Sequence, residues 1–284
     1  MSSLKVAFLS DIHGNSPALR AVLEDIRQAG CAQVFMLGDL INGIDPHGCV
    51  QLLRGWSESS GLGLAALRGN AEAYLTTPER AGLPRQDEAW NAQLMRLVDW
   101  FQDQLSQSDL AWIHALPETL RWRDSWLVHD SPMDRLAAQT QGAPEVQPRH
   151  REWFFHGRGI QPDMEESRWQ ELLAHMEAAG ASRLFCGHTH VPFQRSLDGR
   201  TICNVGSAGA PLDGDPRPAW VLLEEDQDGT STLSIRRVAY DLTAILRLLD
   251  CTPEYPDFVI PGYREAYKKW MQTGVHWRAH LGSA

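Results

Sequence analysis

Five short apolar segments of this chain each lead, within a few residues, to a side chain of a type that binds metal ions. This recurrence constrains the fold more than any other feature. The length and apolar character of the segments predict buried strands. The five segments are Val6–Ser10, Val34–Leu37, Leu64–Leu67, Trp126–Val128 and Leu184–Cys186. Strands of this kind, separated by helical segments, predict an α/β fold.

The side chains that follow these segments are carboxylates, imidazoles and one amide. They are Asp11, His13, Asp39, Asn70, His129, His188 and His190. Because strand ends converge at the carboxyl edge of an α/β sheet, we expect them to meet at one place. The two-residue spacing within each histidine-containing pair predicts an extended backbone that directs both side chains to one side. A glycine precedes Asp39, Asn70 and His188, which suits a backbone that passes close to a ligand.

This donor set favours divalent ions such as manganese, iron, zinc, cobalt or nickel, with manganese as the first expectation. The Asp39 carboxylate has two oxygens and could join two ions, which two-metal sites hold about 3.5–4 Å apart. Two divalent ions, two aspartates and one hydroxide sum to a charge of roughly +1, and this charge attracts a phosphate.

The remaining patterns describe a mixed sheet in a single domain. Ser16 and Pro17 are expected to begin a helix that Gly30 ends. Segment 191–204 predicts a hairpin that turns at Asp198-Gly199. Further strands are expected at Ala219–Leu223 and Thr232–Ala239, and amphipathic helices at Gln93–Leu105 and Asp241–Leu249.

Composition excludes several classes of function. The chain of 284 residues is 43% hydrophobic and 22% charged, as is typical of a globular enzyme. Its net charge of −10 disfavours stable binding to duplex nucleic acid, which depends on many lysines and arginines. Neither a signal peptide nor a membrane span is expected. The five separated cysteines favour a reducing, cytoplasmic location. The oligomeric state does not follow from the sequence.

The ordered motifs resemble those of the calcineurin-like metallophosphoesterases, and among these most closely the small prokaryotic phosphodiesterases. The similarity extends from Lys5 to Leu223. The motifs are Asp11-Ile12-His13-Gly14-Asn15, Gly38-Asp39, Arg68-Gly69-Asn70, Val128-His129 and Gly187-His188-Thr189-His190, followed by Asn204-Val205-Gly206-Ser207. The resemblance implies a four-layer αββα sandwich, in which two stacked mixed β-sheets are flanked by helices.

The resemblance also implies a ligand set and a reaction. The first ion would be bound by Asp11, His13, Asp39 and His190, and the second by Asp39, Asn70, His129 and His188. Asp39, Asn70 and His129 would serve catalysis, with Asn70 also contacting substrate. A hydroxide bridging the ions would attack phosphorus in a small phosphodiester, such as a cyclic nucleotide, or in a phosphomonoester. The alternatives are a protein phosphatase, a dinucleoside polyphosphatase, or a catalytically weak regulatory protein that keeps the metal site.

Two positions depart from the family pattern. Ala71 stands where many members have the histidine regarded as the general acid, and Glu72 one residue later is a candidate for a partial substitute. Asp130 replaces a glycine after His129, where it could engage a metal-bound water or repel an anionic substrate. The absence of an acid favours substrates with good leaving groups, since positioned acid catalysis contributes roughly 10²- to 10⁴-fold.

Two segments contain none of these motifs. Residues 134–170 form a candidate lid insertion in which Arg149, His150 and His156 could contact phosphate, or a loop anchored by aromatic packing. Residues 240–284 form a C-terminal extension. Its aromatic part, Tyr255–Trp277, is expected either to cover the sheet or to contact another subunit.

Overall fold

Two five-stranded mixed sheets form the framework of the protein. The structure is a computed structural model and describes residues 3–76, 88–133, 159–252, 255 and 262–280. The first sheet has the strand order β10-β9-β1-β2-β3. Its strands are β1 (Leu4–Leu9), β2 (Gln33–Met36), β3 (Gly63–Ala66), β9 (Ala219–Glu225) and β10 (Ser231–Arg237). Strands β1, β2 and β3 are parallel, while β9 and β10 are antiparallel to their neighbours.

The second sheet has the order β4-β5-β6-β8-β7. Its strands are β4 (Thr119–Trp122), β5 (Ser125–Val128), β6 (Arg183–Cys186), β7 (Phe193–Leu197) and β8 (Arg200–Asn204). Strands β5, β6 and β8 are parallel, and β4 and β7 lie antiparallel at the two edges. The predicted hairpin is present, and Asp198 (φ 46°) and Gly199 (φ 73°) both adopt the left-handed conformation of its turn.

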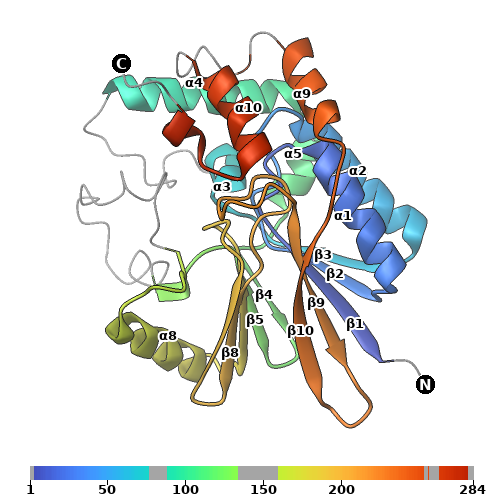
Figure 1. The fold of residues 1–284 in the computed structure, drawn as a ribbon, viewed down its shortest axis with the longest axis vertical. Helices are drawn as coiled ribbons and strands as arrows, with labels where there is room; N and C mark the ends of the chain where they lie inside the picture. Colours follow the sequence, from blue (N-terminus) through green and yellow to red (C-terminus); the bar gives the residue numbers. More distant parts are fainter. Residues whose placement is uncertain (1–2, 77–87, 134–158, 253–254, 256–261, 281–284) are drawn as a thin grey trace.

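The helices cover the sheets and extend beyond one of their ends (Figure 1). They are α1 (Ser16–Ala29), α2 (Pro46–Ser60), α3 (Asn70–Thr76), α4 (Glu88–Gln104), α5 (Gln107–His114), α8 (Glu166–Ala178), α9 (Leu242–Cys251), α10 (Tyr263–Thr273) and the 3₁₀ helix η1 (Trp277–His280). None of the helices within the described ranges combines the length and apolar character needed to cross a membrane.

Successive side chains of each strand point to opposite faces of the sheet, and this divides the core into layers. On β1, Val6 and Phe8 point between the two sheets, where Phe8 stacks on Phe185 of β6 with ring centroids 3.9 Å apart. Ala7 and Leu9 point to the other face and pack with residues of α1 and α2. Because successive side chains of a strand face opposite sides, both faces of β1 are buried. The outer face of the second sheet packs on α8, largely through Trp169 and Leu172. The predicted four-layer αββα sandwich is confirmed.

One detail at the start of α1 differs from the prediction. The N-cap is Asn15 rather than Ser16, because the Asn15 side chain accepts a hydrogen bond from the Ala18 N–H at 3.1 Å. The Ser16 hydroxyl instead donates to Asp45. Gly30 ends the helix in the left-handed conformation, as predicted.

A separate aromatic core joins the C-terminal extension to the rest of the chain. Tyr255, Trp270 and Trp277 pack with Phe101 of α4 and with residues of α9. In Figure 1, α4, α9 and α10 lie together at one end of the two sheets. The aromatic tail therefore packs within its own chain. The candidate lid was predicted at residues 134–170. Residues 134–158 lie outside the described residues, and residues 166–170 form the start of α8.

Candidate metal centre

The predicted ligands lie where five parallel strands end, and their loops are held in register by backbone hydrogen bonds. After β1 and β2, the N–H groups of Asp11 and His13 donate to the carbonyls of Gly38 and Asp39, both at 3.0 Å. After β5 and β6, the Gly187 N–H donates to the His129 carbonyl at 2.9 Å. The loops therefore continue the strand pairing beyond the sheets and bring distant motifs together.

The backbone at most of these ligands is left-handed, which corrects the prediction of extended pairs. Seven described residues other than glycine have a positive φ, and five of them are predicted ligands: Asp11 (55°), His13 (48°), Asp39 (56°), His188 (69°) and His190 (61°). Such angles are uncommon outside glycine and concentrate at functional sites. Asp11 and His13 converge on one group of donors, whereas His190 joins that group and His188 faces His129 and Asn70.

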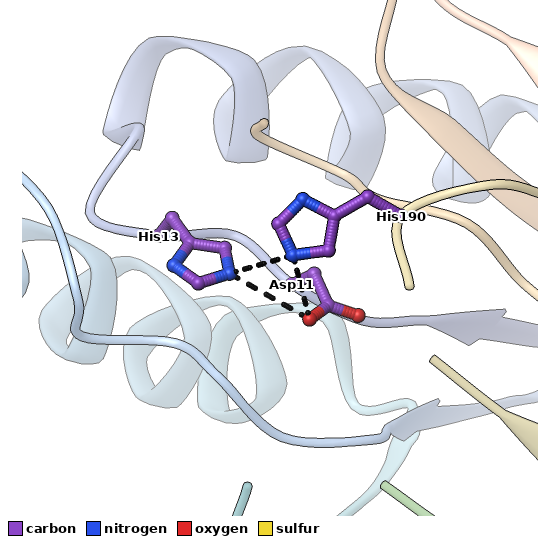
Figure 2. Close-up of side chains that lie close together, drawn as sticks. All are labelled: Asp11, His13 and His190. Carbon is purple, nitrogen blue, oxygen red and sulfur yellow. Dashed lines mark hydrogen bonds and ion pairs between the residues drawn. The ribbon is translucent and has the colours of Figure 1, made fainter. Parts of the chain in front are cut away.

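Three of the ligands form a first group (Figure 2). The Nε2 atoms of His13 and His190 lie 3.0 Å apart, and they lie 3.6 and 3.2 Å from Asp11 Oδ1. Asp39 Oδ2 lies 3.7 Å from His13 Nε2 and so borders the same space. All four side chains are buried or nearly so.

A second group shares Asp39 with the first. Its Oδ2 lies 3.4 Å from His129 Nε2. That nitrogen lies 3.0 Å from Asn70 Oδ1 and 3.3 Å from His188 Nδ1, and the last two atoms are 3.0 Å apart. One carboxylate oxygen therefore borders both groups.

Backbone carbonyls orient three of the four imidazoles. The Nδ1 atoms of His13, His129 and His190 lie 3.1, 2.8 and 2.5 Å from the carbonyl oxygens of Asn42, Leu37 and Ala210. A carbonyl can only accept, so in each ring Nδ1 carries the proton. The Nε2 lone pair of the neutral ring then faces the centre, as a metal ligand requires.

The two carboxylates are oriented in a similar way. Asp11 Oδ2 accepts from the His188 N–H, and Asp39 Oδ1 accepts from the Ala71 N–H, both at 2.8 Å. The opposite oxygens face the groups. Asp11 Oδ1 is buried and receives no hydrogen bond from any described residue, although His190 Nε2 lies 3.2 Å away.

Two glycines allow the loops to approach the carboxylates. A Cβ at Gly69 would lie 2.1 Å from Asp39 Oδ1, and one at Gly187 would lie 2.3 Å from Asp11 Oδ2. Both distances are far below a van der Waals contact. The predicted need for glycine before Asn70 and His188 therefore has a direct steric cause at each position.

The close packing shifts the pKa values of these groups. Burial favours a higher pKa for Asp39, but His129 and His13 outweigh it and lower the pKa to about 2. Burial alone would lower the pKa of His129, but Asp39, Asp11 and Asp130 raise it to about 10. Burial and the neighbouring His129 lower the pKa of His188. The carboxylates therefore hold a proton at His129 when no cation is bound.

The donor atoms of the two groups suit divalent cations. Each group offers four nitrogen or oxygen donors within a few ångströms, without any thiolate, and this chemistry suits manganese, iron, zinc or cobalt. The unsatisfied Asp11 Oδ1 is a further sign, because a buried carboxylate oxygen without a partner is costly unless a cation meets it.

The structure changes the interpretation of Glu72. Its carboxylate is fully buried and accepts from the N–H groups of Asp39 (2.9 Å), Leu40 (2.8 Å), Ile41 (3.3 Å) and Gly69 (2.8 Å). Burial and Asp39 raise its pKa, and the backbone N–H groups oppose that rise. Both oxygens are occupied by the backbone, so Glu72 cannot act as the substitute acid. Its function is to join the loops after β2 and β3.

The other predicted residues fall into two classes. Asp130 acts on the centre through its charge, which raises the pKa of His129 and opposes the lowering at His188. Arg149, His150 and His156 lie outside the described residues, so their contact with substrate stays a prediction.

Sequence reasoning gave no role to Asn204, which supports the last motif. Its buried Nδ2 donates to the Gly187 carbonyl at 2.8 Å and to Thr189 Oγ1 at 2.9 Å. Ser207 similarly donates to the Asp11 carbonyl at 2.6 Å. The sequence feature that could have indicated a role for both residues is the Asn204-Val205-Gly206-Ser207 motif.

Comparison with known proteins agrees with this fold. Residues 4–228 match the model of the calcineurin-like phosphoesterase superfamily domain, and the chain belongs to that superfamily. An uncharacterised protein of Methanocaldococcus jannaschii is 24% identical over 253 residues, which cover 84% of this chain and 88% of that protein.

Two solved structures share the fold over almost their whole length. A metallophosphoesterase from Sphaerobacter thermophilus has a TM-score of 0.62 at 24% identity, covering 96% of this chain and all of that one. A hypothetical protein from Pyrococcus horikoshii has a TM-score of 0.68 at 18% identity, covering 96% and 99%. The family is one of metal-dependent phosphoesterases, as the motifs predicted.

Proposed function

We propose that this protein is a phosphodiesterase that hydrolyses small phosphodiesters with two divalent metal ions bound at the candidate centre. One observation carries the proposal. Asp39 Oδ2 lies 3.7 Å from His13 Nε2 in the first group and 3.4 Å from His129 Nε2 in the second. A single carboxylate oxygen that borders two donor groups is what a two-metal site needs in order to hold its ions close together.

The residues of the chain would hold and orient the ions and the substrate. Asp11, His13, Asp39 and His190 would bind the first ion, and Asp39, Asn70, His129 and His188 the second. When bound, two such ions supply positive charge for a phosphate group and make a water molecule acidic enough to act as a nucleophile near neutral pH. The Nδ1 hydrogen bonds of His13, His129 and His190 favour the tautomer that presents Nε2 to a metal.

The surroundings of Asn70 support a preference for substrates with good leaving groups. Ala71 is 4% exposed and offers only its backbone N–H, which donates to Asp39. Both carboxylate oxygens of Glu72 accept hydrogen bonds from backbone N–H groups. Neither residue can protonate a leaving group, so we expect fast reaction where the leaving group is already a good one. Diesters and monoesters of an acidic alcohol both meet that condition.

Paired model substrates test this proposal. With manganese present, we expect the protein to hydrolyse bis(p-nitrophenyl) phosphate faster than p-nitrophenyl phosphate, and an alkyl phosphate slowest. Ala71→His should raise turnover of the alkyl phosphate by up to the roughly 10²- to 10⁴-fold that acid catalysis contributes. The matched control adds Asp39→Asn to the same variant, and any gain should then disappear. Faster monoester turnover by the unaltered protein, or no gain from Ala71→His, would contradict the proposal.

A further inference from the structure

Helix α10 brings a buried tryptophan against one of the candidate ligands. The ring centroids of Trp270 and His190 are 6.5 Å apart and their planes differ by 16°. Trp270 is 7% exposed, so its indole fills space inside the protein and is not a surface for substrate. The contact of Trp270 is therefore with the candidate metal ligand His190.

The same short segment of backbone holds both rings. The indole N–H of Trp270 donates to the Pro211 carbonyl at 2.8 Å. The Nδ1 atom of His190 lies 2.5 Å from the carbonyl of Ala210, the preceding residue. Two adjacent carbonyls thus fix the indole and the imidazole relative to each other. The hydrogen bond orients the imidazole, and the nearly parallel indole lies beside it.

Helix α10 also contacts the first motif. The side-chain amide of Asn15 donates to the Gly209 carbonyl at 2.8 Å and lies 3.8 Å from the sulfur of Met271. At the end of the helix, the Gly214 N–H donates to the Gly274 carbonyl at 3.1 Å. The C-terminal turn of the helix is therefore joined to the segment 209–214, and this segment borders both Asn15 and His190.

These contacts reach the first group of ligands, whereas the second is supported from the sheets. His129 is oriented by the Leu37 carbonyl after β2, and His188 lies against His129 and Asn70. Helix α10 begins well beyond residue 228, where the match to the family domain ends. The extension thus adds a support to the centre that the family domain does not include.

We propose that Trp270 is a positioning residue for His190, and that through it the C-terminal extension sets the affinity of the first metal position. The inference rests on the proposed function, because it requires that the two groups bind ions. Outer-sphere partners of a metal ligand typically contribute 10- to 100-fold to metal affinity. We therefore expect Trp270→Phe, which removes the indole N–H, to weaken the first position within that range and to leave the second unchanged.

Single-position variants make the two affinities separately measurable. His188→Ala should retain the first position, and His190→Ala the second. Manganese titration by calorimetry on each variant, with and without Trp270→Phe, then compares the two positions. The expected result is about 10- to 100-fold weaker binding in the His188→Ala background and an equal affinity in the His190→Ala background. Trp270→Leu, which also removes the ring, should enlarge the first effect.

A matched control separates positioning from general packing. Trp277→Phe removes the same atoms from the same aromatic core, at a ring that packs on Tyr263 and His276. It should lower the melting temperature about as much as Trp270→Phe while leaving both affinities unchanged. Equal weakening at both positions, or none at the first, would overturn the inference alone. If His188→Ala and His190→Ala bind no manganese while the unaltered protein also binds none, the proposed function fails, and the inference fails with it.

Discussion

At the scale of single residues, the centre depends on which atom of each side chain is left without a protein partner. Asp11 and Asp39 each give one oxygen to a backbone N–H and turn the other to the ligand groups. His13, His129 and His190 give Nδ1 to a carbonyl and turn Nε2 inward. These hydrogen bonds orient most of the donor side chains before an ion arrives.

The electrostatics predict that metal binding releases protons. Without a cation the pKa of His129 is about 10, so at neutral pH the ring is protonated, while Asp39, with a pKa of about 2, is ionised. An ion at the second position must displace the His129 proton, so its apparent affinity should rise by up to about tenfold per pH unit below pH 10.

Calorimetric titration at pH 7.5 in two buffers of different ionisation enthalpy measures this release. We expect close to one proton released per ion at the second position, which His190→Ala isolates from the first. An apparent enthalpy that is the same in both buffers would show that His129 is neutral before binding, contrary to this prediction.

At this scale the sequence predicted which side chains gather at the candidate centre but not the backbone that presents them. The motif order placed all seven side chains at strand ends, because residue type and strand position are local properties. The left-handed residues Asp11, His13 and Asp39 lie in loops that are far apart in sequence and are joined by backbone hydrogen bonds. The same limitation explains Glu72, whose four backbone partners belong to two different loops.

At the scale of elements, α3 connects the sheet to the centre. It begins at Asn70, a candidate ligand, and its first turn carries Glu72, which binds the loop after β2. The helix therefore fixes Asn70 and Asp39 relative to each other, and these two residues belong to the same ligand group.

Removing the charge of Glu72 should destabilise the protein and weaken metal binding. Glu72→Gln replaces one acceptor oxygen with an N–H₂ group that faces backbone donors, and each buried donor left without a partner costs about 1–3 kcal/mol. Urea unfolding in the presence of a chelator should therefore show a loss of about 2–4 kcal/mol. The control Glu24→Gln breaks an exposed pair with Arg27 and should cost less than about 1 kcal/mol. Equal stability of the two variants would exclude a joining role for Glu72.

The elements were predicted well where their pattern is regular. The strands β1, β2, β3, β5, β6 and the hairpin β7–β8 fall within about two residues of the predicted bounds, because apolar runs and turn residues are local signals. The role of α10 was not predictable. Its aromatic residues indicated burial, but only the folded chain shows that Trp270 lies against His190, a residue 80 positions earlier.

At the scale of the whole molecule, the centre connects the two sheets, which also meet through apolar packing and through the ion pair of Arg123 with Glu225. Asp11, Asp39 and Asn70 follow strands of the first sheet, while His129 and His188 follow strands of the second. An ion bound across them links the sheets directly. Metal binding should therefore stabilise the entire fold.

We expect manganese to raise the free energy of unfolding by about 2.7 kcal/mol for each position when the free ion is about 100 times its dissociation constant. Thermal unfolding with manganese and with a chelator measures the difference. Asp39→Asn should abolish most of the increase, because the variant removes the carboxylate that borders both groups. A melting temperature that does not respond to manganese in the unaltered protein would contradict the account.

The most direct test is anomalous diffraction from a crystal of the unaltered protein grown with manganese. The account predicts two anomalous peaks about 3.5–4 Å apart, one among Asp11, His13 and His190 and the other among Asn70, His129 and His188, with Asp39 Oδ2 between them. A single peak, or two peaks that do not share Asp39, would contradict a centre built on that carboxylate.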